Sequence, residues 1–544
     1  MFNFFAVGNS LRTSRTVFAA ASLLTALWWV CVFDYPFWRQ MHAGKLAELG
    51  SHLMPTIYFG ALFFCLAIAV ICLLSLLPGR LFRILLLLLN LSGAVTFTVA
   101  MLYGVLMTPD MVRNFIATDV REAAGYWSFG TLTVFLCAFL PPLAGTYFLH
   151  RPASVGRLTA AGAALAALLA AAGLVFGGFQ TAATVIRGDR SIRYQIAPYS
   201  LIYSGIRMLT KDESPDGPRE RIIVDPNPVM TVRPEKPVLF VVVIGETTRS
   251  ASWGLAGYGR DTTPELRKEN VLNFPEVEAC GTSTDVSLPC MLSRVGRSDY
   301  SRKRILAEES LPALLARAGF DVSWIDNQAG CKGTCEGVRK APPEKTAALC
   351  GKSGCYDEVL IAETRKALAE AKPGRPAVLF LHMMGQHGPA YWERTPEHLK
   401  VWGPECRSAD LSRCTSESIA AAYDNSVRYT DRVLADLIRT LKSRTEADTA
   451  LVFVSDHGES LGEEGLYLHG APFLIAPGVQ KTVPMVMWFS EGFAGDFSID
   501  RAALRGRAAK GGITHEHLFS TVLGLLRVKS SAARRAFDLT ARRP

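Results

Sequence analysis

The sequence predicts two kinds of structure in one chain: an N-terminal bundle of five transmembrane helices and a C-terminal α/β domain with a mostly parallel sheet. Three observations support this division. Hydrophobic residues make up 49% of the 544 residues, and their excess lies before residue 180. Five apolar stretches there approach the ~20 residues that cross a bilayer. After residue 236, apolar strands alternate with helical stretches, which is typical of a sheet covered on both faces.

Pairs of arginines lie in the segments before the first predicted membrane helix, between the second and third, and between the fourth and fifth. The positive-inside rule places these segments in the cytoplasm, and five crossings then put everything after residue 180 on the far side. The length of the first span and its two tryptophans argue against a cleaved signal peptide. The spans are 16–34, 55–78, 82–107, 127–149 and 158–179, and the pairs are Arg12 and Arg15, Arg80 and Arg83, and Arg151 and Arg157.

We expect a transmembrane domain at 1–180, a connector at 181–235 and a catalytic domain at 236–544. The connector is Pro-rich, and its segment 200–210 could form an amphipathic bridging helix on the membrane. Within loop 108–126, a polar row would share one helix face. That row is either a solvated surface or a grip for a lipid headgroup, and it consists of Asn114, Thr118 and Glu122.

Eight of the 12 cysteines lie in the polar C-terminal part and pair by proximity. An even number in short closed loops suggests disulfides and an oxidising compartment. Zinc thiolates are the alternative, but the spacing contains no CxxC pair and no matching histidines. The expected pairs are Cys280 with Cys290, Cys331 with Cys335, Cys350 with Cys355, and Cys406 with Cys414.

Acidic and histidine residues follow two of the predicted strands. In parallel sheets, sites lie beyond the carboxyl ends of the strands. Glu246 follows one strand, and Asp456 and His457 follow another, so oxygen and nitrogen ligands suited to Zn²⁺ would meet there. The predicted strands are 237–245, 321–326, 377–384, 450–455 and 483–489, and the main helices are 309–319, 357–371, 416–443 and 514–527.

The segment Cys280–Cys290 is dense in hydroxyl groups, and a disulfide would make it rigid. A metal-bound hydroxyl loses its proton more easily and becomes a nucleophile; the plainer interpretation is a helix cap. Other polar residues at strand ends could hold phosphate oxygens or protonate a leaving group. They are Asn327, Lys332, His387 and His469, whereas His382 could simply be a packed core histidine.

Five sequence blocks resemble the phosphoethanolamine transferases that modify bacterial lipid A, the family that includes the mobile colistin-resistance enzymes. The Cys-bracketed threonine block is highly specific, whereas the Asp-His-Gly block is shared with alkaline-phosphatase-like and sulfatase-like enzymes. The blocks are IGETTR (244–249), CGTSTDVSLPCM (280–291), DNQAGCKGTC (326–335), LHMMGQHGP (381–389) and SDHGESLGE (455–463).

The resemblance implies an alkaline-phosphatase-like fold and a catalytic zinc. It implies that Thr284 becomes the covalent carrier of phosphoethanolamine and that Asn114, Thr118 and Glu122 take part in substrate binding. Lys332, His387 and His469 match positions that contact the phosphoryl group or a second zinc. The implied zinc ligands are Glu246, Thr284, Asp456 and His457.

Two sequence features depart from the family pattern. Asp285 follows the implied nucleophile where relatives tend to have alanine, and its carboxylate would either repel an anionic donor or point away. Glu516 and His517 stand where Asp-Asn is usual, which leaves the role of His515 open.

We therefore expect an inner-membrane enzyme with a periplasmic catalytic domain, acting as a monomer. It would transfer phosphoethanolamine from phosphatidylethanolamine to lipid A. The alternatives are a related transferase acting on lipopolysaccharide core sugars, a phosphoglycerol transferase, and a catalytically inactive membrane sensor. The net charge of +9 comes without a basic run interleaved with aromatics, so we expect no nucleic-acid partner.

Overall fold

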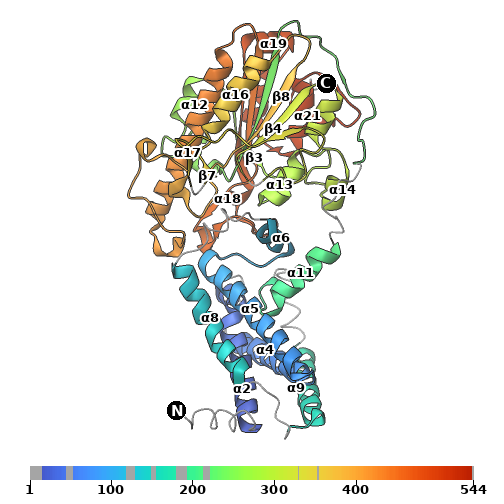
Figure 1. Cartoon of the computed structure of the whole chain (residues 1–544), viewed down its shortest axis with the longest axis vertical. Helices are drawn as coiled ribbons and strands as arrows, with labels where there is room; N and C mark the ends of the chain where they lie inside the picture. The colour runs from blue at the N-terminus through green and yellow to red at the C-terminus, as the bar shows by residue number, and fades with distance from the viewer. Residues whose placement is uncertain are drawn as a thin grey trace. The chain divides into compact units, whose positions relative to one another are not determined.

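The structure is a computed structural model of the chain (Figure 1). It describes residues 15–43, 53–117, 129–148, 155–178, 193–211, 221–328, 330–351 and 354–541. The chain divides into two compact units, which we call the helical unit and the α/β unit. The helical unit is Met1–Val112 with Ser128–Thr210, and the α/β unit is Arg113–Trp127 with Lys211–Pro544.

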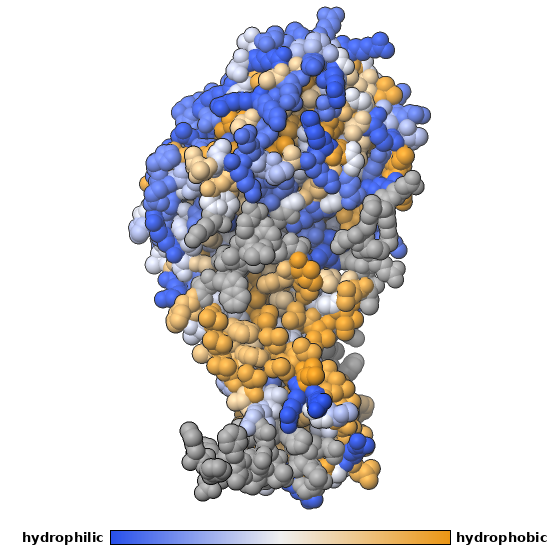
Figure 2. Space-filling view, viewed as in Figure 1, coloured by the Kyte–Doolittle hydropathy of each residue, from blue (hydrophilic) through white to orange (hydrophobic). Residues whose placement is uncertain are grey.

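The helical unit contains five helices long and apolar enough to cross a membrane, as predicted. Hydrophobic residues cover most of the surface drawn for these helices, whereas hydrophilic residues dominate that of the α/β unit (Figure 2). The five are α2 (Arg15–Trp28) with its π-helical continuation η1 (Trp29–Phe33), α4 (Leu53–Leu74), α5 (Gly79–Tyr103), α8 (Phe129–Phe148) and α9 (Arg157–Gly177). Shorter helices are α3 (Tyr35–Ala43), α6 (Pro109–Ala117) and α11 (Tyr199–Lys211).

A buried asparagine joins three of the apolar helices. Asn90 accepts a hydrogen bond of 2.8 Å from the indole of Trp29 and donates one of 2.9 Å to Thr146. Apolar surface alone does not hold helices together in lipid, so small packed contacts and such polar links specify the bundle.

One eight-stranded sheet forms the centre of the α/β unit, in the order β13–β3–β12–β9–β2–β8–β4–β5. Only β12 runs against its neighbours β3 and β9, so the prediction of a mostly parallel sheet is confirmed. The strands are β2 (Val238–Gly245), β3 (Leu272–Glu278), β4 (Asp321–Asp326), β5 (Arg339–Ala341), β8 (Ala377–His382), β9 (Asp448–Ser455), β12 (Thr482–Phe489) and β13 (Ile513–Thr514).

Five of these strands match predicted ones, and β3, β5 and β13 do not. The central strands β2 and β9 are buried at every position and therefore appear in the sequence as continuous apolar runs. β3 instead alternates between buried and more exposed residues and includes Pro275, which weakens the strand signal. β5 and β13 have three and two residues, too few for a period to show.

Helices cover both faces of the sheet. Figure 1 shows α16 (Val359–Glu370) and α17 (Ser416–Lys442) on one side, and α13 (Thr284–Met291) and α21 (Glu516–Leu525) on the other. Thr415 begins the long helix α17 by accepting a hydrogen bond from the Ser418 amide. The described residues also contain the four predicted disulfides, all in the α/β unit.

Gly458 lies where two backbone segments meet closely, and its replacement tests this packing. A Cβ added there would lie 2.0 Å from the Val479 carbonyl oxygen, which is backbone and cannot move aside. We expect Gly458→Ala to destabilise the α/β unit by about 2 kcal/mol or more. Gly259→Ala is the control, because that Cβ would have nothing within 4 Å. Thermal unfolding of the purified full chain measures both, and equal midpoints would contradict the structure.

Candidate active site

The carboxyl ends of β2 and β9 bring three buried side chains together. The strands are parallel neighbours with Gly245 opposite Ser455, so the residues that follow them emerge side by side. Glu246, Asp456 and His457 are each fully buried. One ligand atom from each lies within 4.8 Å of the others. The structure therefore brings these three side chains together, as expected from the two strand ends, and their role as metal ligands stays a prediction.

Thr284 meets this cluster from the other side. It is the first residue of α13, and its hydroxyl donates a hydrogen bond of 3.0 Å to Glu246 Oε2. The Thr284 hydroxyl oxygen also lies 3.3 Å from His457 Nε2. Ser287, one turn further along the helix, donates a 2.5 Å hydrogen bond to the Asp456 carbonyl and so fixes α13 against the end of β9.

The residues present fit a divalent cation. His457 Nδ1 lies 3.0 Å from the Gly458 carbonyl, so Nδ1 carries the proton and Nε2 keeps its lone pair. That Nε2 lies 3.4 Å from both Glu246 Oε1 and Asp456 Oδ2. Burial lowers the pKa of His457 to about 4, which favours the neutral, ligating form. Asp456 Oδ2 has no hydrogen-bond donor among the described residues. Two carboxylates and a neutral imidazole suit zinc.

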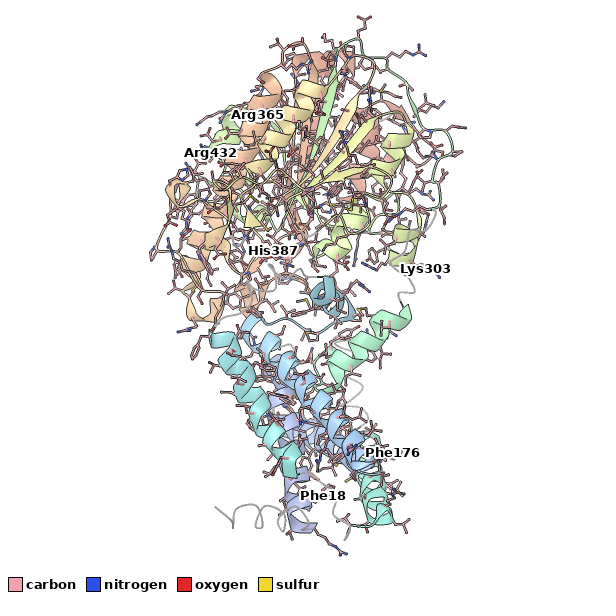
Figure 3. The ribbon with its side chains drawn as sticks, viewed as in Figure 1. Phe18, Phe176, Lys303, Arg365, His387 and Arg432 are labelled. Carbon is pink, nitrogen blue, oxygen red and sulfur yellow. A yellow bond between two sulfur atoms is a disulfide. The ribbon has the colours of Figure 1, made fainter. Side chains whose placement is uncertain are left out.

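Two further histidines, His387 and His469, adjoin the cluster. The ring of His469 lies 4.5 Å from that of His457 and 5.6 Å from that of His387. His469 Nδ1 lies 2.8 Å from Glu459 Oε2, and Tyr391 donates a 2.6 Å hydrogen bond to the other oxygen of Glu459. His387 lies at the end of the sheet where the strands converge (Figure 3). Glu459 thus orients His469, a role that its place two residues after His457 could have suggested.

Other predicted site residues lie around or beyond this cluster. The amide of Asn327 donates to Cys355 and Asp357, so it supports the loop rather than the cluster. Gln328, which was not predicted, donates a 3.1 Å hydrogen bond to Glu246 Oε2. Lys332 is half-buried in the loop after β4 with a φ of 47°. Asn114 lies on α6, its side chain outside the described part, and Thr118 and Glu122 lie outside the described residues altogether.

His382 is a structural histidine. It is fully buried, and its Nδ1 lies 3.1 Å from Asp326 Oδ2, which also accepts a hydrogen bond from Trp324. Burial alone would raise the pKa of Asp326, but His382 and these hydrogen bonds hold it well below its usual range.

His515 joins the loop that contains Thr284 to the strand end that carries Asp456 and His457. Its Nδ1 accepts a 3.0 Å hydrogen bond from the Cys280 amide, and its Nε2 donates to the Ser455 carbonyl at 2.9 Å. Both ring nitrogens are thus used, and burial lowers the pKa of His515 to about 4, so the ring is neutral. His515 therefore helps to position Thr284 through the backbone of its loop.

Removing a carboxylate of the cluster tests the metal assignment. We expect Glu246→Gln and Asp456→Asn each to weaken zinc binding by more than about 100-fold, because even outer-shell changes cost 10- to 100-fold. Asn327→Ala is the control, because Asn327 lies outside the cluster. Elemental analysis of the purified full chain after dialysis against a zinc buffer measures the bound metal. Equal zinc in all variants would contradict the assignment.

Comparisons with known proteins agree with these observations. Residues 63–212 match the family model described as phosphoethanolamine transferase EptA/EptB, and residues 239–528 match the one described as sulfatase. Phosphoethanolamine transferase EptA of Salmonella typhimurium is 34% identical over 82% of this chain and 83% of its own length. Phosphatidylethanolamine transferase Mcr-1 of Escherichia coli is 31% identical over 81% and 83%.

A solved structure resembles both units. It is the integral membrane protein lipooligosaccharide phosphoethanolamine transferase A of Neisseria meningitidis, with a TM-score of 0.88 and 33% identity over 96% of this chain and 99% of that one. The α/β unit alone resembles the structure of the soluble domain of that transferase, with 41% identity over 60% of this chain and 99% of that one, and a TM-score of 0.57. The chain is therefore an integral membrane protein that belongs to the phosphoethanolamine transferase family.

Proposed function

We propose that this protein transfers phosphoethanolamine from phosphatidylethanolamine to a phosphate group of lipid A, with Thr284 as the covalent carrier. The observation that carries the proposal is the Thr284 hydroxyl, which lies at a helix N-terminus within hydrogen-bonding distance of both Glu246 and His457. The relatives' names supply the transferred group. The disulfides and the arginine pattern favour a periplasmic site on the bacterial inner membrane.

In the first step, Thr284 Oγ1 attacks the phosphorus of the donor. The hydroxyl proton is lost to solvent, a phosphorus–oxygen bond forms to Thr284, and the bond to the diacylglycerol oxygen breaks. A zinc ion held by Glu246, Asp456 and His457 would supply the positive charge that lowers the pKa of the hydroxyl and stabilises the phosphoryl oxygens. His469, oriented by Glu459, is placed to give a proton to the departing glycerol oxygen.

In the second step, a phosphate oxygen of lipid A attacks the same phosphorus and releases Thr284. Thr284 is the first residue of α13, so the backbone N–H groups at this helix start would lie near the transferring group and favour its negative charge. The product gains an ammonium group, so its surface becomes less negative and binds cationic peptides more weakly.

The carboxylate of Asp285, next to the proposed nucleophile, is paired with an arginine. Arg302 binds its carboxylate at 3.0 and 3.1 Å and also donates a 2.9 Å hydrogen bond to its backbone carbonyl. This arginine on α14 (Arg302–Ala307) therefore neutralises the carboxylate and clamps the start of α13. A buried carboxylate without such a partner would repel an anionic phosphodiester.

Replacement of the nucleophile tests the proposed carrier. We expect Thr284→Ala to lower transfer at least about 1,000-fold, because the covalent route is lost, and Thr284→Ser to retain part of it. Ser283→Ala is the control, because the Ser283 side chain does not cap the helix. Mass spectrometry of lipid A from cells measures transfer, and peptide mass spectrometry of protein quenched with donor locates the adduct. Modified lipid A in cells carrying only Thr284→Ala would refute the mechanism.

The Asp285–Arg302 pair predicts an asymmetric pattern of loss. Arg302→Ala leaves the buried carboxylate beside Thr284 with the more distant Arg113, 3.6 Å from Asp285 Oδ2, as its remaining arginine partner, so we expect activity to fall about 10- to 100-fold. Asp285→Ala alone should cost little, and the double variant should recover most of the activity. Transfer rates of the three purified variants measure this. If the double variant is as impaired as Arg302→Ala, activity depends on the hydrogen bond from Arg302 to the Asp285 carbonyl and not on neutralisation of the Asp285 carboxylate.

A further inference from the structure

A short apolar tip projects from the α/β unit just after His469. We define it as Pro472, Phe473, Leu474 and Ile475, in the loop before α18 (Gly478–Lys481). Leu474 is 89% exposed, the highest value for a large apolar side chain among the described residues of this unit, and Ile475 is 47% exposed. Single exposed apolar residues are ordinary, so the tip needs an explanation only if the structure holds it outward.

The loop is held in this outward conformation. The Pro472 carbonyl accepts hydrogen bonds of 2.9 Å from the amides of both Ile475 and Ala476, which makes one tight turn. The Phe473 ring lies under two cations, with the Arg297 guanidinium at 3.9 Å and the Lys481 ammonium at 5.4 Å from its centroid. Leu474 and Ile475 therefore cannot fold inward without breaking these contacts.

The base of the tip is attached to the loop that carries the nucleophile. The Thr282 hydroxyl donates a 2.6 Å hydrogen bond to the Ala471 carbonyl, and the Gly470 amide donates one of 2.7 Å to the Thr282 carbonyl. Arg297 also contacts the Cys280 carbonyl at 3.4 Å. Thr282 is two residues before Thr284, so the tip adjoins the reaction site.

We propose that the tip inserts into the lipid layer beside the site, with Leu474 and Ile475 among acyl chains and Arg297 and Lys481 near headgroup phosphates. Apolar residues bordered by cations are typical of segments that lie in the bilayer interface. The same chain contains five helices long and apolar enough to cross a membrane, so this unit is tethered to a bilayer. The part of the proposal that concerns substrate capture rests on the proposed function, because a lipid donor must present its headgroup at Thr284.

Fluorescence quenching tests the insertion without any transfer reaction. The full chain carrying Leu474→Trp is reconstituted into vesicles of phosphatidylethanolamine and phosphatidylglycerol with brominated acyl chains. The unmodified protein gives the background of the native tryptophans. We expect the added tryptophan to be quenched in brominated vesicles and not in ordinary ones.

Val229→Trp is the matched control for quenching. Val229 is 53% exposed and pairs with Lys529. Lys529 follows the C-terminal end of α21, whereas His515 immediately precedes the N-terminal end of that helix. The Val229→Trp variant should show no difference between the two vesicles. Absence of quenching at residue 474, or equal quenching at residues 474 and 229, would overturn the proposal.

Transfer kinetics test the consequence for the substrate. For the double variant Leu474→Ser with Ile475→Ser, we expect KM for long-chain phosphatidylethanolamine in vesicles to rise about 10-fold or more, because two apolar side chains no longer enter the lipid. The kcat with a short-chain, water-dispersed donor should be unchanged, and Val229→Ser should alter neither value. An unchanged KM in vesicles would overturn the role in substrate capture. If the unmodified protein transfers nothing from any donor, the proposed function fails while quenching still decides the insertion.

Discussion

The site depends on the parallel pairing of β2 and β9, which forces two carboxylates into one buried space. Gly245 and Ser455 are opposite each other, so Glu246 and Asp456 have no freedom to separate. Buried like charges are costly unless a cation or donors offset them. Neutral His457 directs a lone pair into the same space, which adds a ligand and no positive charge. The fold therefore creates a candidate cation site as a consequence of strand register.

Besides its hydrogen bond to Glu246, Thr284, the proposed nucleophile, is held by contacts that do not involve the side chains of the candidate metal ligands. The Cys280–Cys290 disulfide closes the loop, Ser287 bonds the Asp456 carbonyl, and His515 bridges Cys280 to Ser455. The Ser287 and His515 contacts end on the backbone, so the start of α13 is held against the strand itself. A carrier residue needs this rigidity, because a displacement of about 1 Å can cost 100-fold in rate.

The sequence predicted those parts of the site that depend on chain direction. Glu246, Asp456 and His457 follow long apolar strands, and parallel strands end at one edge, so their meeting could be inferred. Thr284 was singled out by resemblance, because several hydroxyls crowd its loop. The contacts of His515 could not be inferred. His515 meets Cys280 across 235 residues, and no local periodicity records such a contact. Strand β3 was missed because one of its faces is not buried.

Asp285 shows how a departure from a family pattern can be accommodated. A second carboxylate beside the nucleophile would disfavour an anionic donor, yet Arg302 binds both its side chain and its carbonyl. The guanidinium thus removes the charge and fixes the start of α13 through the same contacts. Such a buried ion pair can contribute little net free energy to an intact protein, yet the removal of one partner is damaging because the other charge is left buried. Its persistence in this chain needs no direct contribution of Asp285 to the chemistry, only the continued presence of its arginine partners, Arg302 at 3.0 Å and Arg113 at 3.6 Å.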